Sequence, residues 1–214
     1  MDNVIEIDSE IVGWRVLKGD EDRSGEGSSI SYSHAPKRPL ELQCEIHKAS
    51  IRGELWTILV GLLNGRPYEV IGGLSVYIDI PNKYKDGILT KRPRKTVNAR
   101  YDLKFGENGD EVMLKDVVAI FDNPTYGSLT RMISMSLRHG VPVQYIVEQL
   151  QKDKHSDMFS FSRVIARVLK KYIEDGTRAS NGAIRCNCET ADSSSFVYQG
   201  GCVMCTSCGY SACG

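Results

Sequence analysis

Cysteines are the residues whose type and spacing most plainly predict chemistry in this chain. The sequence contains seven cysteines, and all but Cys44 lie between Cys186 and Cys213. They follow the pattern C-x-C, thirteen residues, then C-x2-C-x2-C-x4-C. Thiolates are zinc ligands, and thiols also carry reducing equivalents by disulfide exchange. This segment therefore predicts metal binding, thiol redox chemistry, or both.

Two cysteine pairs held apart by a short ribbon can supply four thiolates to a tetrahedral zinc ion. Gly200 and Gly201 in the spacer suit the turn of such a ribbon. C-x2-C is the usual zinc half-site, which favours the first such pair after the glycines. The preferred metal ligands are therefore Cys186, Cys188, Cys202 and Cys205.

This assignment leaves Cys208 and Cys213 as a thiol pair spaced C-x4-C. The loop between them is short enough to close a disulfide, so the pair can pass reducing equivalents between two partners. A different division stays open, with Cys186, Cys188, Cys205 and Cys208 on zinc and with Cys202 and Cys213 as the remaining thiols. A purely structural zinc ribbon with surplus thiols is the simpler interpretation.

The charge balance limits the classes of partner. Lys+Arg and Asp+Glu both number 27, which argues against a basic nucleic-acid binder and a polybasic membrane contact. No stretch approaches the roughly 20 apolar residues of a membrane span, and the acidic start lacks the pattern of a secretion signal. We expect a cytoplasmic protein, with no membrane or direct nucleic-acid partner, whose thiols stay reduced.

The elements ahead of the cysteines predict an α+β domain. Alternating or continuous apolar runs predict strands over residues 44–51, 54–63, 66–73, 75–81, 99–105 and 110–117, with hairpins at 64–65 and 107–109. The basic, polar residues 82–99 predict a loop or an irregular ribbon. Apolar residues at helical spacing then predict three helices, over residues 126–137, 142–150 and 161–172. The expected domains are a segment and linker (1–39), the α+β domain (40–175), a flexible connector (176–185) and the cysteine-rich, zinc-ribbon-like tail (186–214).

Three further patterns outside the tail carry two interpretations each. Cys44 and His47 resemble a nucleophile with its base, but a buried strand cysteine is the simpler alternative. The basic run at residues 91–95 suits phosphate contact or a solvated loop. Residues 128–131 open a helix and suit anion binding, or ordinary capping by Ser128 or Thr125.

The residues GGCVMCTSCGYSACG resemble the C-terminal tail of adenosylcobalamin-dependent (class II) ribonucleotide reductases. Upstream, KRPLELQCEIHKASIRGELWTILVGLLNGRPYEVIGG, FDNPTYGSLTRMISMSLRHGVPVQYIVEQL and FSFSRVIARVLKKYI resemble the region before that tail, so the likeness covers residues 36–214. In that family a C-terminal cysteine pair re-reduces the active centre, and thioredoxin or glutaredoxin reduces the pair in turn. The resemblance implies this role for Cys208 and Cys213.

The resemblance also implies what lies elsewhere. The family's catalytic barrel, with its cobalamin and nucleotide sites, has no counterpart in these 214 residues. We therefore expect the small chain of a split ribonucleoside-diphosphate reductase that serves deoxyribonucleotide synthesis and DNA replication. Zinc would bind this chain, and adenosylcobalamin a large catalytic partner. The alternatives are a non-enzymatic protein-binding adaptor with a structural zinc knuckle, and an independent thiol oxidoreductase.

Overall fold

The computed structural model describes residues 34–51, 53–93, 99–107, 109–121, 123–152, 161–179, 186, 188 and 195–211. The chain divides into two units, Met1–Tyr32 and Ser33–Gly214. Of the segment and linker expected over residues 1–39, residues 1–33 lie outside the described residues. The second unit is described below.

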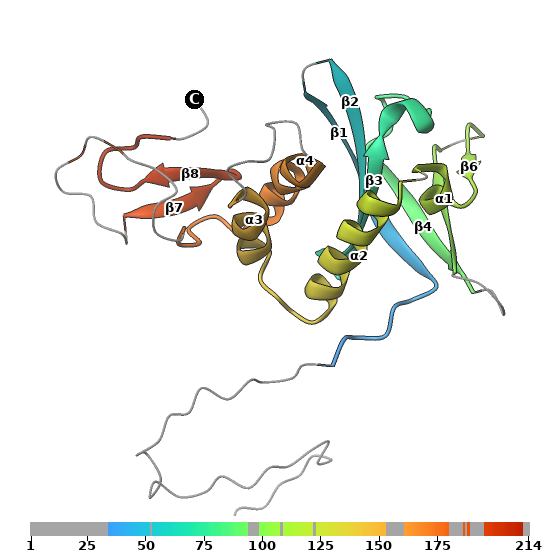
Figure 1. Cartoon of the computed structure of the whole chain (residues 1–214), viewed down its shortest axis with the longest axis horizontal. Coiled ribbons are helices and arrows are strands. Elements are labelled where there is room, and N and C mark those ends of the chain that lie inside the picture. Colours follow the sequence, from blue (N-terminus) through green and yellow to red (C-terminus); the bar gives the residue numbers. More distant parts are fainter. Residues whose placement is uncertain are drawn as a thin grey trace, which may run out of the picture. The chain divides into compact units, whose positions relative to one another are not determined.

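An antiparallel sheet forms the centre of the domain, with the strand order β3-β2-β1-β4-β5-β6 (Figure 1). Its strands are β1 (Glu41–Ile51), β2 (Glu54–Leu63), β3 (Arg66–Leu74), β4 (Asp86–Arg92), β5 (Arg100–Phe105) and β6 (Val112–Leu114). Asn64 and Gly65 have φ values of 52° and 76° in the β2–β3 turn, which confirms the hairpin predicted there, because such turns need positive φ at both positions.

The two faces of the sheet bury different apolar clusters, because successive side chains of a strand point to opposite faces. On one face, Cys44, Leu59 and Leu89 pack with Phe121 of helix α1 (Val117–Phe121). On the other face, Trp56 and Ile58 pack with helices α2 (Pro124–Arg138), α3 (Val143–Gln151) and α4 (Phe161–Leu169). None of the helices within the described residues is long and apolar enough to cross a membrane.

Helix α2 lies against the edge strand β3. The hydroxyl of Ser134 accepts a hydrogen bond from the backbone N–H of Val70, at 2.9 Å. Since β3 is the outer strand of the sheet, this contact satisfies a backbone group that an uncovered edge would leave open to pairing with another chain. Asn123 caps the helix by accepting from the N–H of Tyr126, so the cap predicted at Ser128 or Thr125 is wrong.

Three local predictions differ from the structure. Residues Ser75–Tyr77 form a 3-10 helix, η1, where a strand was expected. Strand β4 occupies part of the predicted loop or irregular ribbon over residues 82–99, because it pairs with β1 on one side and with β5 on the other. The predicted strand over 110–117 is shorter: β6 ends at Leu114 and α1 begins at Val117, so α1 is added to the three predicted helices. The α+β class is confirmed.

The tail forms a separate two-stranded hairpin of β7 (Phe196–Gln199) and β8 (Cys202–Cys205). Gln199 pairs with Cys202, so Gly200 and Gly201 make the two-residue turn, with φ values of 56° and 76°. The predicted glycine turn is thereby confirmed. Tyr198 and Val203 of the hairpin are buried in the same cluster as α4, so the hairpin shares its core with the domain.

Candidate metal centre

Cys205 and Cys208 lie on the two sides of a tight turn that follows β8. The N–H of Gly209 donates to the carbonyl of Cys205, and the N–H of Cys205 donates to the carbonyl of Tyr210, both at 2.8 Å. Gly209 has a φ of 74°, a conformation that favours glycine directly after the second cysteine. The turn folds the C-x2-C pair back on itself, so both thiols face one point.

Four thiols gather at this turn. The Sγ atoms of Cys186, Cys188, Cys205 and Cys208 all lie within 4.8 Å of one another, and those of Cys186 and Cys205 are 3.6 Å apart. A tetrahedral zinc ion with Zn–S bonds of about 2.3 Å needs sulfur atoms about 3.8 Å apart. The spacing and the all-sulfur donor set therefore fit zinc, with the C-x-C pair, Cys186 and Cys188, among the four thiols.

The thiols of the turn differ in acidity. Burial alone would raise the pKa of Cys205, but the backbone N–H groups of Cys208 and Ser207 and the Cys186 thiol lower it to about 7. The N–H of Tyr210 favours the thiolate of Cys208 and lowers its pKa. Burial and the thiols of Cys205 and Cys186 have a larger, opposite effect, so the pKa of Cys208 rises to about 11. Backbone donors aimed at sulfur stabilise a thiolate, so Cys205 is prepared to act as a ligand.

Cys202 is not a member of this cluster, although C-x2-C spacing also joins it to Cys205. Both residues are in strand β8, where positions three apart point to opposite faces. Cys202 is instead disulfide-bonded. The grouping matches the alternative division of the cysteines and differs from the preferred one at Cys202 and Cys208.

The remaining predicted site residue, Cys213, lies outside the described residues. Cys208 was a ligand only in the alternative division of the cysteines, and the preferred division placed it in the redox pair. The motif that could have identified it is C-T-S-C-G (residues 205–209), because a glycine after the second cysteine is what the observed turn requires.

The hairpin is tied to the end of the helical region. The N–H of Gly176 donates to the carbonyl of Tyr198 and the N–H of Tyr198 donates to that of Thr177, both at 2.8 Å. Arg178 forms an isolated bridge with Val197. Residues 176–179, expected to belong to a flexible connector, thus run beside β7 and are joined to it by one isolated bridge and by backbone hydrogen bonds.

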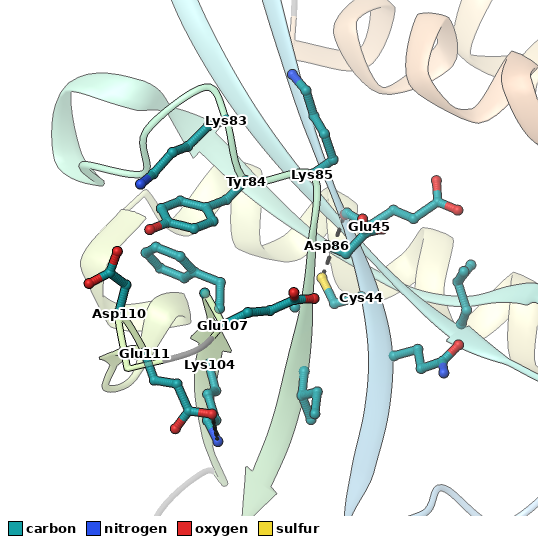
Figure 2. A pocket seen from close by; sticks show the side chains of 16 residues that line it. Cys44, Glu45, Lys83, Tyr84, Lys85, Asp86, Lys104, Glu107, Asp110 and Glu111 are labelled. Carbon is teal, nitrogen blue, oxygen red and sulfur yellow. Dashed lines mark hydrogen bonds and ion pairs between the residues drawn. The ribbon is translucent and has the colours of Figure 1, made fainter.

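Cys44 does not pair with His47. The two side chains point to opposite faces of β1, because three positions separate them along one strand. Cys44 lines a cavity of about 780 Å³, surrounded by lysines and carboxylates (Figure 2), and its thiol donates to the carbonyl of Glu45. Burial, followed by the carboxylate of Glu69, raises the pKa of Cys44 well above its ordinary value. A buried strand cysteine is what the structure shows.

His47 contacts a different pair of side chains. Its Nε2 lies 2.6 Å from the hydroxyl of Tyr172, which donates to the carboxylate of Glu45, also at 2.6 Å. Burial and the positive charge of Lys171 lower the pKa of His47. The group joins β1 to the 3-10 helix η2 (Lys170–Tyr172) that follows α4.

Comparison with known proteins identifies the domain. A family model described as the NrdJ homologue C-terminal domain matches residues 42–174, more than half of the chain. The chain belongs to this family. The match spans the sheet and the helices, and it relates the chain to NrdJ, the class II ribonucleotide reductase. No curated protein and no solved structure matches the chain.

Proposed function

We propose that this NrdJ-related chain is the small component of a split class II ribonucleoside-diphosphate reductase. The α+β domain would dock on a large catalytic chain that holds adenosylcobalamin, and the tail would bring reducing equivalents to it. The family membership of residues 42–174 supports the partner. The observation that carries the relay is that Cys202 is disulfide-bonded and is not a member of the four-thiol cluster.

The thiols divide by role in this proposal. Cys186, Cys188, Cys205 and Cys208 hold zinc, which folds the base of the tail. Cys202 is one redox cysteine. Cys213 is its partner in the alternative division of the cysteines, and this proposal adopts that pair. The pair that the spacing favours, Cys208 with Cys213, is the alternative that the experiment below distinguishes.

The relay is a two-electron exchange. A thiolate of the reduced pair attacks a disulfide on the catalytic chain and forms a mixed disulfide. The second thiol of the pair then attacks the first, which releases the catalytic chain as a dithiol and leaves Cys202 and Cys213 joined. Two electrons and two protons thereby pass to the catalytic chain. A thioredoxin or glutaredoxin dithiol reverses the tail disulfide by the same steps.

A second function is favoured by one observation, the anchoring of the hairpin in the domain core through Tyr198 and Val203. A tail held this firmly suits a non-enzymatic adaptor whose zinc knuckle is purely structural. In that case every tail thiol is protected and none is redox-active. The two functions differ in the reactivity of Cys202.

The test is a count of reactive thiols on the reduced, zinc-loaded protein, by alkylation without unfolding and peptide mass mapping. We expect one zinc ion and rapid labelling of Cys202 and Cys213, both lost on mild oxidation. Rapid labelling of Cys208 with Cys213 would reverse the division of roles. No rapid labelling in the tail would favour the adaptor. Cys44→Ser is the control, because that thiol is buried and outside the tail.

A further inference from the structure

A second cavity lies beside helix α2. It has a volume of about 590 Å³, and its lining comes from strands β3, β4 and β5 and from helices α1 and α2. Two of the lining residues, Arg131 and Met135, are exposed on α2, so the cavity opens onto the outward face of that helix. The tail chemistry does not use this part of the domain.

The outward face of α2 carries an apolar centre between two cations. Arg131, Met135 and Arg138 follow the i, i+4, i+7 spacing that keeps side chains on one side of a helix, and Met132 lies next to them. Met132 and Met135 are 58% and 47% exposed. Exposed methionines are typical of surfaces that bind other proteins, because the thioether chain is flexible and apolar. At 1.5 Å of rise per residue, the two arginines are about 10 Å apart along the helix.

The charge at the cavity is positive. Lys91 comes from β4, and Arg131 and Arg138 come from α2, whereas Glu69 is the acidic residue among the described lining residues. Arg131 donates to the hydroxyl of Ser128, at 3.1 Å. That contact uses one of the five N–H donors of a guanidinium group, so Arg131 can also bind a carboxylate. This local excess of cations lies in a chain whose total charge is zero.

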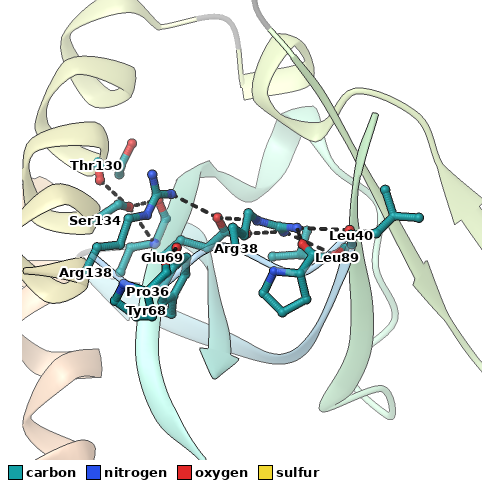
Figure 3. Close-up of polar contacts among 11 residues, drawn as sticks. Pro36, Arg38, Leu40, Tyr68, Glu69, Leu89, Thr130, Ser134 and Arg138 are labelled. Carbon is teal, nitrogen blue, oxygen red and sulfur yellow. Dashed lines mark hydrogen bonds and ion pairs between the residues drawn. The ribbon is translucent and has the colours of Figure 1, made fainter. Parts of the chain in front are cut away.

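The carboxylate of Glu69 is already neutralised (Figure 3). Arg38 contacts it with two nitrogen atoms, Nε at 3.0 Å and Nη2 at 2.5 Å, and Arg138 adds a third contact at 3.0 Å. The Nε of Arg138 is buried without a hydrogen-bond partner among the described residues. Two arginines on one carboxylate therefore leave positive charge available at the cavity wall.

The other walls of the cavity are apolar and aromatic. Phe121 and Tyr101 line it, and the ammonium group of Lys91 lies 5.9 Å from the centre of the Tyr101 ring. Gly127 leaves the backbone of α2 open, since the nearest atom to an added Cβ is a guanidinium nitrogen of Arg131, at 3.5 Å. Another chain can approach the helix closely at this point.

We propose that the outward face of α2 and the adjoining cavity form a docking surface for an acidic, amphipathic helix of a partner protein. Two carboxylates seven positions apart would meet Arg131 and Arg138, because arginine forks match carboxylates. The apolar residues between them would pack on Met132 and Met135, as anchors do when a helix binds a groove. A small anion or a nucleic-acid backbone would leave these methionines exposed. The surface does not depend on the tail relay, so either proposal can fail alone.

The first test is fluorescence anisotropy of labelled helical peptides titrated with the full chain. One peptide carries two glutamates seven positions apart with leucines between them; one control has glutamine for glutamate, and the other has alanine for leucine. We expect the first peptide to bind at least about tenfold more tightly than either control. Equal binding by either control would overturn the requirement for an acidic, amphipathic partner. No binding of the first peptide at millimolar concentration would overturn the whole proposal.

The second test places the peptide on α2. Arg131→Gln should weaken its binding about tenfold, whereas Arg167→Gln, which removes an exposed arginine of α4 outside the cavity, should leave it unchanged. Met132→Gln with Met135→Gln should also weaken binding about tenfold without lowering the midpoint of thermal unfolding, because both residues are exposed and glutamine favours helix as well as methionine does. Equal affinity in Arg131→Gln and Arg167→Gln, or parental affinity in the methionine variant, would overturn the assignment.

A second copy of this chain is the competing occupant of the surface. Sedimentation equilibrium of the chain alone should give the same mass for the parent and for the double variant of Met132 and Met135. A parental dimer that the double variant dissociates would overturn the choice of a partner protein.

Discussion

The cysteine tail and the α+β domain bring interacting groups together by different routes. In the tail, Cys205 and Cys208 are three residues apart and a single turn joins their thiols; Cys186 is 19 residues from Cys205. In the domain, Glu69 meets Arg38 from 31 residues away and Arg138 from 69 residues away. Local geometry accounts for each pair of the first cluster, and only the assembled sheet and helices create the second.

The two regions are nevertheless not independent, because Tyr198 and Val203 of the hairpin share a buried cluster with α4. If metal ligation holds the tail and burial holds the domain, substitutions should separate the two forms of stabilisation. The predictions that follow test this difference, in order of decreasing effect.

The largest effect is expected from Cys205→Ser, which removes the buried member of the four-thiol cluster. Structural zinc contributes about 10–16 kcal/mol of apparent binding energy in small zinc-binding peptides, so losing a ligand should empty the site and unfold the hairpin. Metal analysis should give close to no zinc. Cys202→Ser is the matched control and should keep one zinc ion. Equal zinc content in the two variants would contradict the proposed ligand set.

Arg38→Met should destabilise the domain by about 3–5 kcal/mol, because it leaves the carboxylate of Glu69 buried without its main partner. Urea unfolding followed by tryptophan fluorescence measures this loss, since Trp56 is buried in the domain. Zinc content should not change. The neighbouring Lys37→Met should cost little, because Lys37 is exposed. A similar loss in both variants would show that the buried pair is not the cause.

Gly201→Ala should destabilise the protein by about 1–2 kcal/mol, because a residue with a Cβ is strained in the left-handed conformation. The loss should be larger than that caused by Gly200→Ala. Both glycines have positive φ, but an added Cβ at Gly201 would lie 3.3 Å from the carbonyl of Lys170, whereas at Gly200 nothing lies within 4 Å. The difference in unfolding free energy between the two variants measures the contact between the tail turn and the domain. No difference would mean that this contact contributes nothing.

The smallest effect concerns His47, which makes the unfolding free energy of the domain depend on pH. Its pKa in the folded chain is lowered from 6.5, so below about pH 6.5 the unfolded chain binds more protons and stability falls as the pH falls. The slope cannot exceed about 1.4 kcal/mol per pH unit for one proton. Comparing urea unfolding at pH 7 and pH 5, His47→Gln should be less sensitive to acid than the parent. Asp102 has a lowered pKa below 3.8 and affects a more acidic range.

Local patterns in the sequence were sufficient for much of this protein. Helical spacing located α2, α3 and α4 within a few residues, and Asn64-Gly65 and Gly200-Gly201 located two tight turns. These features depend on neighbouring residues, so spacing and glycine positions can determine them. Local patterns failed at Ser75–Tyr77, where apolar residues resembling a strand form a 3-10 helix.

Only the tertiary structure decided which thiols and which charges meet. The spacing C-x2-C occurs twice among Cys202, Cys205 and Cys208. The strand conformation of the first pair points its thiols apart, and the turn of the second brings them together. Lys91 and Arg131 likewise belong to two unrelated patterns in the sequence, and only strand pairing and helix packing bring them to the lining of one cavity. Spacing along a chain determines contacts within a few residues, whereas contacts between distant residues depend on how the buried faces pack.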